Sequence, residues 1–177
     1  MIESRYWKEE LSRIVKTIRP VQKPVRWSER AHCIVERDLM IGFFIVRRLI
    51  ELHKVTSKTR DYSMTVFSCP VQAKHVHRMN VHDHWETYDL ESERRESKKP
   101  LYLSNQFIHA CTSFVARDET HNWSDVYIVS DYDRNDRIWR IPVAQIRGLF
   151  SVASKDHPYS VTMVYREEKG DYEVSTK

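Results

Sequence analysis

Four histidines that fall close together in the sequence are the first candidates for chemistry: His75, His77, His82 and His84. If residues 78–81 form a hairpin loop, the histidines before the loop face those after it. Side chains two apart on a strand share a face, so all four imidazoles would lie on one surface, where zinc or nickel can bind. A register shift of one residue would separate the pairs, and solvent-facing histidines are then the alternative. Zinc is therefore a candidate cofactor.

Arg48 and His53 form a second candidate pair. An arginine stabilises phosphate charge while a histidine moves a proton. The spacing resembles the R-x4–6-H motif of HEPN-type ribonucleases, a resemblance that covers six of the 177 residues. In that family the two residues act without a metal at a helical dimer groove, which implies a small metal-independent ribonuclease. The other interpretation is that Arg47, Arg48 and Glu51 form surface ion pairs at the end of a core helix.

Basic residues gather in the first third of the chain. Residues 1–60 hold 14 Lys and Arg against 7 Asp and Glu, a net +7, while residues 61–177 hold 15 against 18, a net −3. Basic side chains bind phosphate, and an aromatic ring can stack on an unpaired base. The candidate nucleic-acid-binding residues are Arg19, Lys23, Arg26, Trp27 and Arg30. A helical region with solvated cations is the alternative, in which Trp27 packs on the start of the next helix.

Several classes of function are excluded by the composition. The chain has only three glycines, and it contains no Walker A loop, dinucleotide-binding fingerprint or G-x-S-x-G elbow. The spacing of Asp131, Asp133 and Asn135 matches the start of an EF-hand calcium loop. That loop requires glycine and glutamate at the positions of Asp136 and Pro142, so a turn is expected instead. Three scattered cysteines and an N-terminus without an apolar segment indicate a reduced, cytoplasmic protein.

Two helices are expected in the first third, over residues 4–19 and 28–54, with Ser28 as the N-cap of the second. The second is apolar on every side from Leu39 to Val46 and is expected to be buried all round. Eight apolar residues are far fewer than the roughly 20 of a membrane span, so no membrane partner is expected. Gly42 is expected to let another backbone pack closely.

The residues after these two helices are predicted to form mainly strands separated by turns. Residues 91–99, of which seven are charged, are expected to be an exposed loop. Residues 101–116 favour strand, short helical turn and strand, although a helix capped by Ser104 also fits. The other expected elements are strands over 63–69, 73–90, 123–131 and 137–143, a helix over about 142–153, and a closing hairpin formed by YSVTMVYR and YEVST.

These patterns predict one α+β domain over residues 1–177, with two N-terminal helices packed on a mostly antiparallel sheet. No specific catalytic constellation is present. The leading functional hypothesis is therefore a non-enzymatic binding or regulatory module of a cytosolic assembly. We expect the module to associate with a protein partner or to form a homo-oligomer, and to contact nucleic acid through its basic third. The alternatives are the ribonuclease and the metal-binding protein described above.

Overall fold

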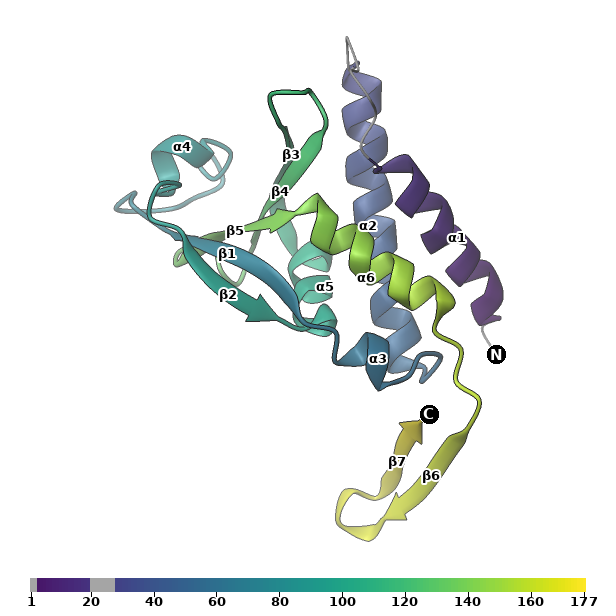
Figure 1. Ribbon diagram of the computed structural model, residues 1–177. Helices are drawn as coiled ribbons and strands as arrows, with labels where there is room; N and C mark the ends of the chain where they lie inside the picture. Colours follow the sequence, from purple (N-terminus) through teal and green to yellow (C-terminus); the bar gives the residue numbers. More distant parts are fainter. Residues whose placement is uncertain (1–2, 20–27) are drawn as a thin grey trace.

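The computed structural model describes residues 3–19 and 28–177 and has the predicted α+β architecture (Figure 1). Its helices are α1 (Ser4–Thr17), α2 (Glu29–Glu51), α3 (Ser57–Arg60), α4 (His84–Thr87), α5 (Pro100–Ile108), α6 (Val143–Lys155) and the short 3-10 helix η1 (Glu167–Lys169). Its strands are β1 (Met64–Pro70), β2 (Arg94–Lys98), β3 (Ala110–Arg117), β4 (Trp123–Ser130), β5 (Arg137–Pro142), β6 (Val161–Arg166) and β7 (Asp171–Thr176).

Five strands form one antiparallel sheet in the order β2-β1-β5-β4-β3, while β6 and β7 form a separate two-stranded sheet. Successive side chains on a strand point to opposite faces. Ile128 and Trp139 accordingly join the main core beneath the helices, whereas Val129 and Ile138 join a smaller core on the other face. Residues from the 71–90 segment complete that smaller core.

The helical layer follows from the predicted apolar stripes. Leu11, Ile14 and Ile18 are fully buried, and α1 lies antiparallel to α2 and also packs on α6 (Figure 1). Ser28 caps α2 as expected, because its hydroxyl accepts a hydrogen bond from the backbone N–H of Ala31 at 3.2 Å.

The prediction that α2 is buried on every side is wrong. Ile41 and Phe44 are exposed, because α1, α5 and α6 cover only part of the helix surface. Gly42 does provide close packing, but the neighbour is a side chain and not a backbone. A Cβ atom added there would lie 2.3 Å from Cε2 of Phe150.

Three local predictions in the middle of the chain are corrected. Residues 73–90 form no strand; they hold bends, turns and the short helix α4. The charged stretch 91–99 contains strand β2, which pairs with β1 at the edge of the sheet. Residues 101–103 lie in helix α5, followed directly by β3.

The expected elements of the last third are confirmed. Strands β4 and β5 are antiparallel, α6 occupies the predicted position near 142–153, and β6 and β7 form the closing hairpin. Within the described residues, no helix combines the length and apolar character that crossing a membrane requires.

Candidate functional site

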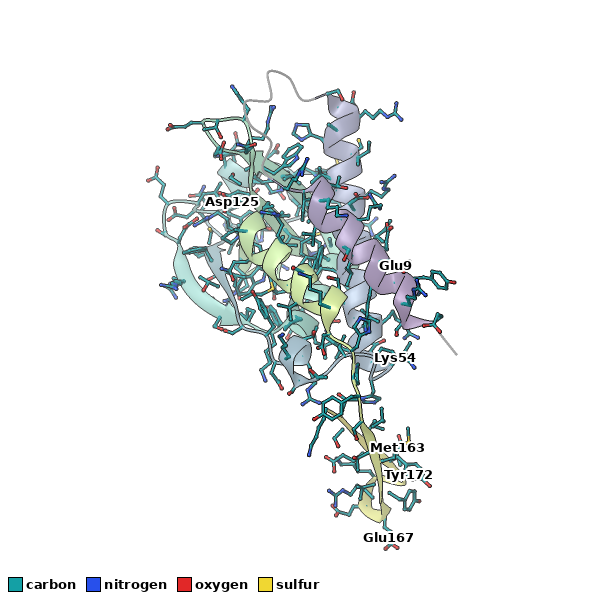
Figure 2. All side chains as sticks on the ribbon, turned by 45° about the vertical axis from the view of Figure 1, so that its right-hand side comes forward. Glu9, Lys54, Asp125, Met163, Glu167 and Tyr172 are labelled. Carbon is teal, nitrogen blue, oxygen red and sulfur yellow. The ribbon has the colours of Figure 1, made fainter. Side chains whose placement is uncertain are left out.

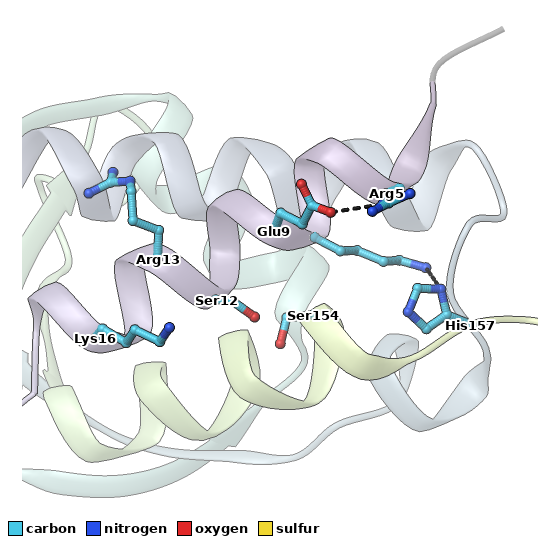
Figure 3. A pocket seen from close by; sticks show the side chains of 8 residues that line it. Arg5, Glu9, Ser12, Arg13, Lys16, Ser154 and His157 are labelled. Atoms are coloured by element: carbon cyan, nitrogen blue, oxygen red, sulfur yellow. Dashed lines mark hydrogen bonds and ion pairs between the residues drawn. The ribbon is translucent and has the colours of Figure 1, made fainter.

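The basic third lines a groove between α1 and α6, with a volume of about 560 Å³ (Figure 3). Its cationic side chains come from one face of α1, and Ser154 and His157 close it from the other side. A cationic groove of this kind is the place where an anionic ligand would be expected.

Most of the groove's cations already have partners within the protein. Arg5 bonds Glu9 at 2.8 Å, and Arg13 bonds both Glu10 at 2.7 Å and the buried Asp38 at 3.1 Å. Nζ of Lys8, a buried residue, donates to the carbonyl oxygens of Lys54 and Asp156 at 2.7 and 2.6 Å, and burial lowers its pKa. Arg13 thereby joins α1 to α2, and Lys8 joins α1 to the residues that follow α2 and α6, so few of these cations are free to bind a ligand.

The predicted nucleic-acid-binding residues are placed only in part. Arg19 and Arg30 are exposed and lie near the ends of the described segments 3–19 and 28–177. Lys23, Arg26 and Trp27 lie outside the described residues, so the predicted contact with nucleic acid stays a prediction.

Arg48 and His53 have structural contacts at the end of α2. The guanidinium of Arg48 bonds Glu51 at 2.7 Å, and Arg47 bonds the same carboxylate at 2.6 Å, as the ion-pair interpretation expected. His53 has a left-handed φ of 53°, and Lys54 N–H donates to the Leu49 carbonyl at 2.8 Å. This is the Schellman arrangement that ends many helices. Ribonuclease activity stays a prediction.

The four clustered histidines do not face one another across a hairpin. In the loop, Asn80 accepts from the N–H of His77 at 2.8 Å and donates to the carbonyl of His75 at 2.9 Å. The imidazoles of His82 and His84 instead lie 3.3 and 3.2 Å from the Thr112 hydroxyl. Across residues 3–19 and 28–177, no three His, Cys, Asp or Glu side chains are grouped to hold a metal ion.

His84 is the one member of this set that is buried, and it packs on the ring of Phe114 with ring centroids 4.6 Å apart. Burial lowers the pKa of His84 to about 4, with a smaller contribution from nearby His82, while Asp83 acts in the opposite direction. The imidazole is therefore neutral in the folded protein at neutral pH.

Acidification is expected to destabilise the protein through His84. In the unfolded chain this imidazole takes up a proton near its ordinary pKa of 6.5, and in the folded state only near 4. Between these values the unfolded state binds more protons, so the free energy of unfolding falls as the pH drops from 6.5 towards 4. Urea unfolding at several pH values measures how the free energy of unfolding depends on pH. This dependence should be weaker for His84→Phe, whereas His75→Gln, at an exposed position, should keep the dependence of the wild type. An equal dependence in all three proteins would contradict this assignment.

The hairpin formed by β6, η1 and β7, called the hairpin arm below, has two unlike faces. The register pairs Met163 with Val174 and Tyr165 with Tyr172, and directly opposed residues share a face. The apolar face carries Val161, Met163, Tyr165, Tyr172 and Val174. The opposite face is polar apart from Val164 and holds the Arg166–Glu173 ion pair at 2.7 Å.

The hairpin arm extends from the body, attached only at its base (Figures 1 and 2). The hydroxyl of Thr176 donates to the Val55 carbonyl at 2.8 Å, and the backbones of Ser160 and Lys177 bond one another. All six residues of β6 are exposed, so its apolar face meets solvent.

A second apolar surface lies on the helices and is called the helical strip below. It consists of Tyr6, Trp7, Ile41 and Phe44, and the rings of Trp7 and Phe44 have centroids 5.9 Å apart. Arg37 and Arg48 lie four residues before Ile41 and four after Phe44, so the same face of α2 carries a cation at each end of the strip.

Neither surface was identified from the sequence as a binding site. The alternation that builds the apolar face is visible in residues 161–165 and 172–174, but it equally fits a hairpin that covers the sheet. The apolar run in α2 indicated burial, and the number of helices packed around it decides which of its residues remain exposed.

Comparison of the chain with known protein-family models, with curated proteins and with solved structures finds no match.

Proposed function

We propose that this protein is a non-enzymatic binding module that assembles through its hairpin arm, and that the partner is a second copy of the chain. The observation that supports the proposal most directly is the apolar face of the arm, which nothing in the described residues of the same chain covers.

The physical argument is that a lone two-stranded hairpin is marginally stable in water. It gains stability when its apolar face is covered. Here that face consists of large side chains, and Tyr165 and Tyr172 already pack edge to face with centroids 5.2 Å apart. Exposed apolar patches of this kind, bordered by polar residues, mark interaction sites.

The choice of a second copy rests on complementarity within the chain. The arm, residues 161–176, carries four carboxylates and two cations, and the helical strip lies in the basic third between Arg37 and Arg48. Arg37 and Arg48 also bond Asp38 and Glu51, each at 2.7 Å, so the complementarity of the two surfaces is mainly apolar, and the carboxylates of the arm add a weaker attraction to these arginines. Two copies related by a twofold axis would make this contact twice, as a closed symmetric dimer requires.

The experiment compares two faces of the same arm. Met163 on the apolar face is 63% exposed, and Val164 on the polar face is 45% exposed, so neither is needed to pack the body. Sedimentation velocity over a range of concentrations should show a dimer for the wild type. The double change Met163→Ser/Tyr165→Ser should raise the dissociation constant about a hundredfold, since each buried side chain contributes about 1.5 kcal/mol or more. Val164→Ser should leave it unchanged.

Other outcomes would identify other partners. A wild type that stays monomeric at all concentrations, or equal effects of the two changes, would overturn assembly through this face. If the monomer instead bound RNA with an affinity that fell steeply with salt, the basic third would be the functional surface. Phe44→Ser tests the other side of the contact, and an unchanged dissociation constant would remove the helical strip from the interface.

A further inference from the structure

A second pocket, separate from the hairpin arm, lies between α2, α5 and the turn that joins β4 to β5, and has a volume of about 650 Å³. Volumes of 300–1,000 Å³ are typical of pockets that bind small ligands. The residues that line it include Arg47, Tyr102, Asn105, Gln106, His109 and Tyr132. Tyr102, Asn105 and Gln106 on α5 and its C-cap His109 recur at positions i, i+3, i+4 and i+7, so one face of this helix forms a wall.

Hydrogen bonds hold the framework of this pocket. The carboxylate of Asp133 accepts from the hydroxyl of Tyr102 at 3.1 Å and from the indole N–H of Trp139 at 2.7 Å. The backbone N–H of Asp131 donates to the carbonyl of His109 at 3.0 Å, which joins the turn to the end of α5. The walls are therefore preformed, as binding sites usually are.

Gln106 is the feature of the pocket that points to a ligand. The residue is only 4% exposed, and its side-chain carbonyl oxygen has no hydrogen-bond partner among the described residues. Leaving a buried acceptor unpaired is unfavourable. Gln106 lines the pocket, and rotation of its amide about the last bond exchanges the positions of the carbonyl and amino groups without moving the chain, so a ligand N–H group can satisfy the carbonyl.

The rim and the opposite wall supply two further kinds of contact. Tyr132 is 90% exposed and presents an aromatic ring at the rim, where a planar ring can stack. Arg47 and His109 also line the pocket, together with Asp131, whose carboxylate bonds Arg134 at 3.3 Å. Arg47 bonds Glu51 through Nε at 2.6 Å, so the two terminal nitrogens of its planar guanidinium are the groups that suit phosphate oxygens. Asn105 adds an amide beside Gln106.

We propose that this pocket binds a small ligand with a planar heteroaromatic ring, N–H donors on the ring edge and an anionic group, the chemistry of a purine nucleoside monophosphate. The ring stacks on Tyr132, its N–H edge meets Gln106, and the phosphate meets Arg47. The site is independent of the hairpin arm, so binding here does not require assembly.

The test is calorimetric titration with AMP and GMP, with adenosine and ribose 5-phosphate as probes that lack one half of the ligand. At least one nucleotide should bind, and both half-ligands should bind at least tenfold more weakly. Tyr132→Ala should weaken nucleotide binding at least fivefold, in keeping with the loss of one stacking contact. Tyr159→Ala, which removes another tyrosine of 85% exposure, should leave binding unchanged.

Three results would overturn the proposal: no heat of binding for either nucleotide at millimolar concentration, equal affinity for ribose 5-phosphate, or equal effects of the two tyrosine changes. Gln106→Met provides a further measurement, because it keeps the length of the side chain and removes the carbonyl. It should weaken binding while the unfolding midpoint stays the same or rises, since an unpaired buried acceptor is removed. Undiminished nucleotide affinity in this variant would contradict the role of Gln106.

Discussion

Asp156→Ala is expected to lower the free energy of unfolding by about 4 kcal/mol, one of the two largest losses that we predict for a single change. The Asp156 side chain follows α6 and is buried. Its Oδ2 accepts from the backbone N–H groups of Thr56 and Thr59 at 3.0 and 3.2 Å, and from their hydroxyl groups at 3.1 and 2.6 Å. Alanine would remove the acceptor of the Thr56 N–H and of both hydroxyl groups at the start of α3, where Thr59 is buried, whereas the Thr59 N–H would keep its bond to the Thr56 carbonyl at 3.2 Å.

Asp118 provides a matched comparison for this prediction. Its Oδ1 accepts from the N–H and hydroxyl of Thr120 at 2.9 and 2.6 Å and from the N–H of Asn122 at 3.0 Å, but in an exposed turn. Water can replace those bonds, so Asp118→Ala should have a much smaller effect. Urea unfolding followed by circular dichroism measures both. Similar losses for the two variants would show that burial does not determine the effect.

Gly42→Ala is expected to destabilise the protein by about 2 kcal/mol, although alanine is the better helix former. The added methyl group would lie 2.3 Å from the ring of Phe150. That ring is fully buried and packs edge to face on Phe43, which in turn stacks on Phe107 with centroids 3.9 Å apart. Moving Phe150 therefore disturbs the centre of the core.

Gly148→Ala is the control, because it also places alanine within a helix. There the nearest atom is the hydroxyl oxygen of Tyr62 at 2.6 Å, the far end of a side chain that is not fully buried and can move aside. Thermal unfolding should show a lower midpoint for Gly42→Ala and an equal or higher one for Gly148→Ala. A higher midpoint in both would mean that the core around Phe150 accommodates the methyl group.

The elements that could be predicted are those whose pattern is local. The stripe of Leu11, Ile14 and Ile18, the cap at Ser28 and the β4–β5 hairpin depend on residues only a few positions apart. The periodicity of apolar residues and the capping residues therefore predict these elements directly. The α+β class followed from the order of these elements.

The elements that were predicted wrongly depend on contacts between residues that are far apart in the sequence. Strand β2 has no apolar pattern, yet Glu96 accepts from the hydroxyl of Ser68 at 2.6 Å and bonds Arg137 at 3.1 Å. In the same region Glu93 pairs with Arg140. These partners lie on β1 and β5, so the charge pattern of residues 91–99 alone could not show that they form a strand.

The histidine cluster illustrates the same limit for a candidate site. The sequence shows four imidazoles close together, but their arrangement depended on an assumed hairpin register. In the structure Thr112, from strand β3, lies beside His82 and His84, and the other two histidines belong to a loop held by Asn80. Proximity along the chain did not place the four side chains on one surface.

By itself, the sequence determined the pairs Arg47/Glu51 and Arg48/Glu51 on α2 and the amphipathic alternation of the hairpin, because neighbours along a helix or hairpin meet regardless of the rest of the fold. Only the tertiary structure decided that the apolar face of the arm and the exposed side of α2 remain uncovered, and that Arg47, Gln106 and Tyr132 line one pocket. Burial depends on which distant elements pack against a surface, and local periodicity carries no information about that packing.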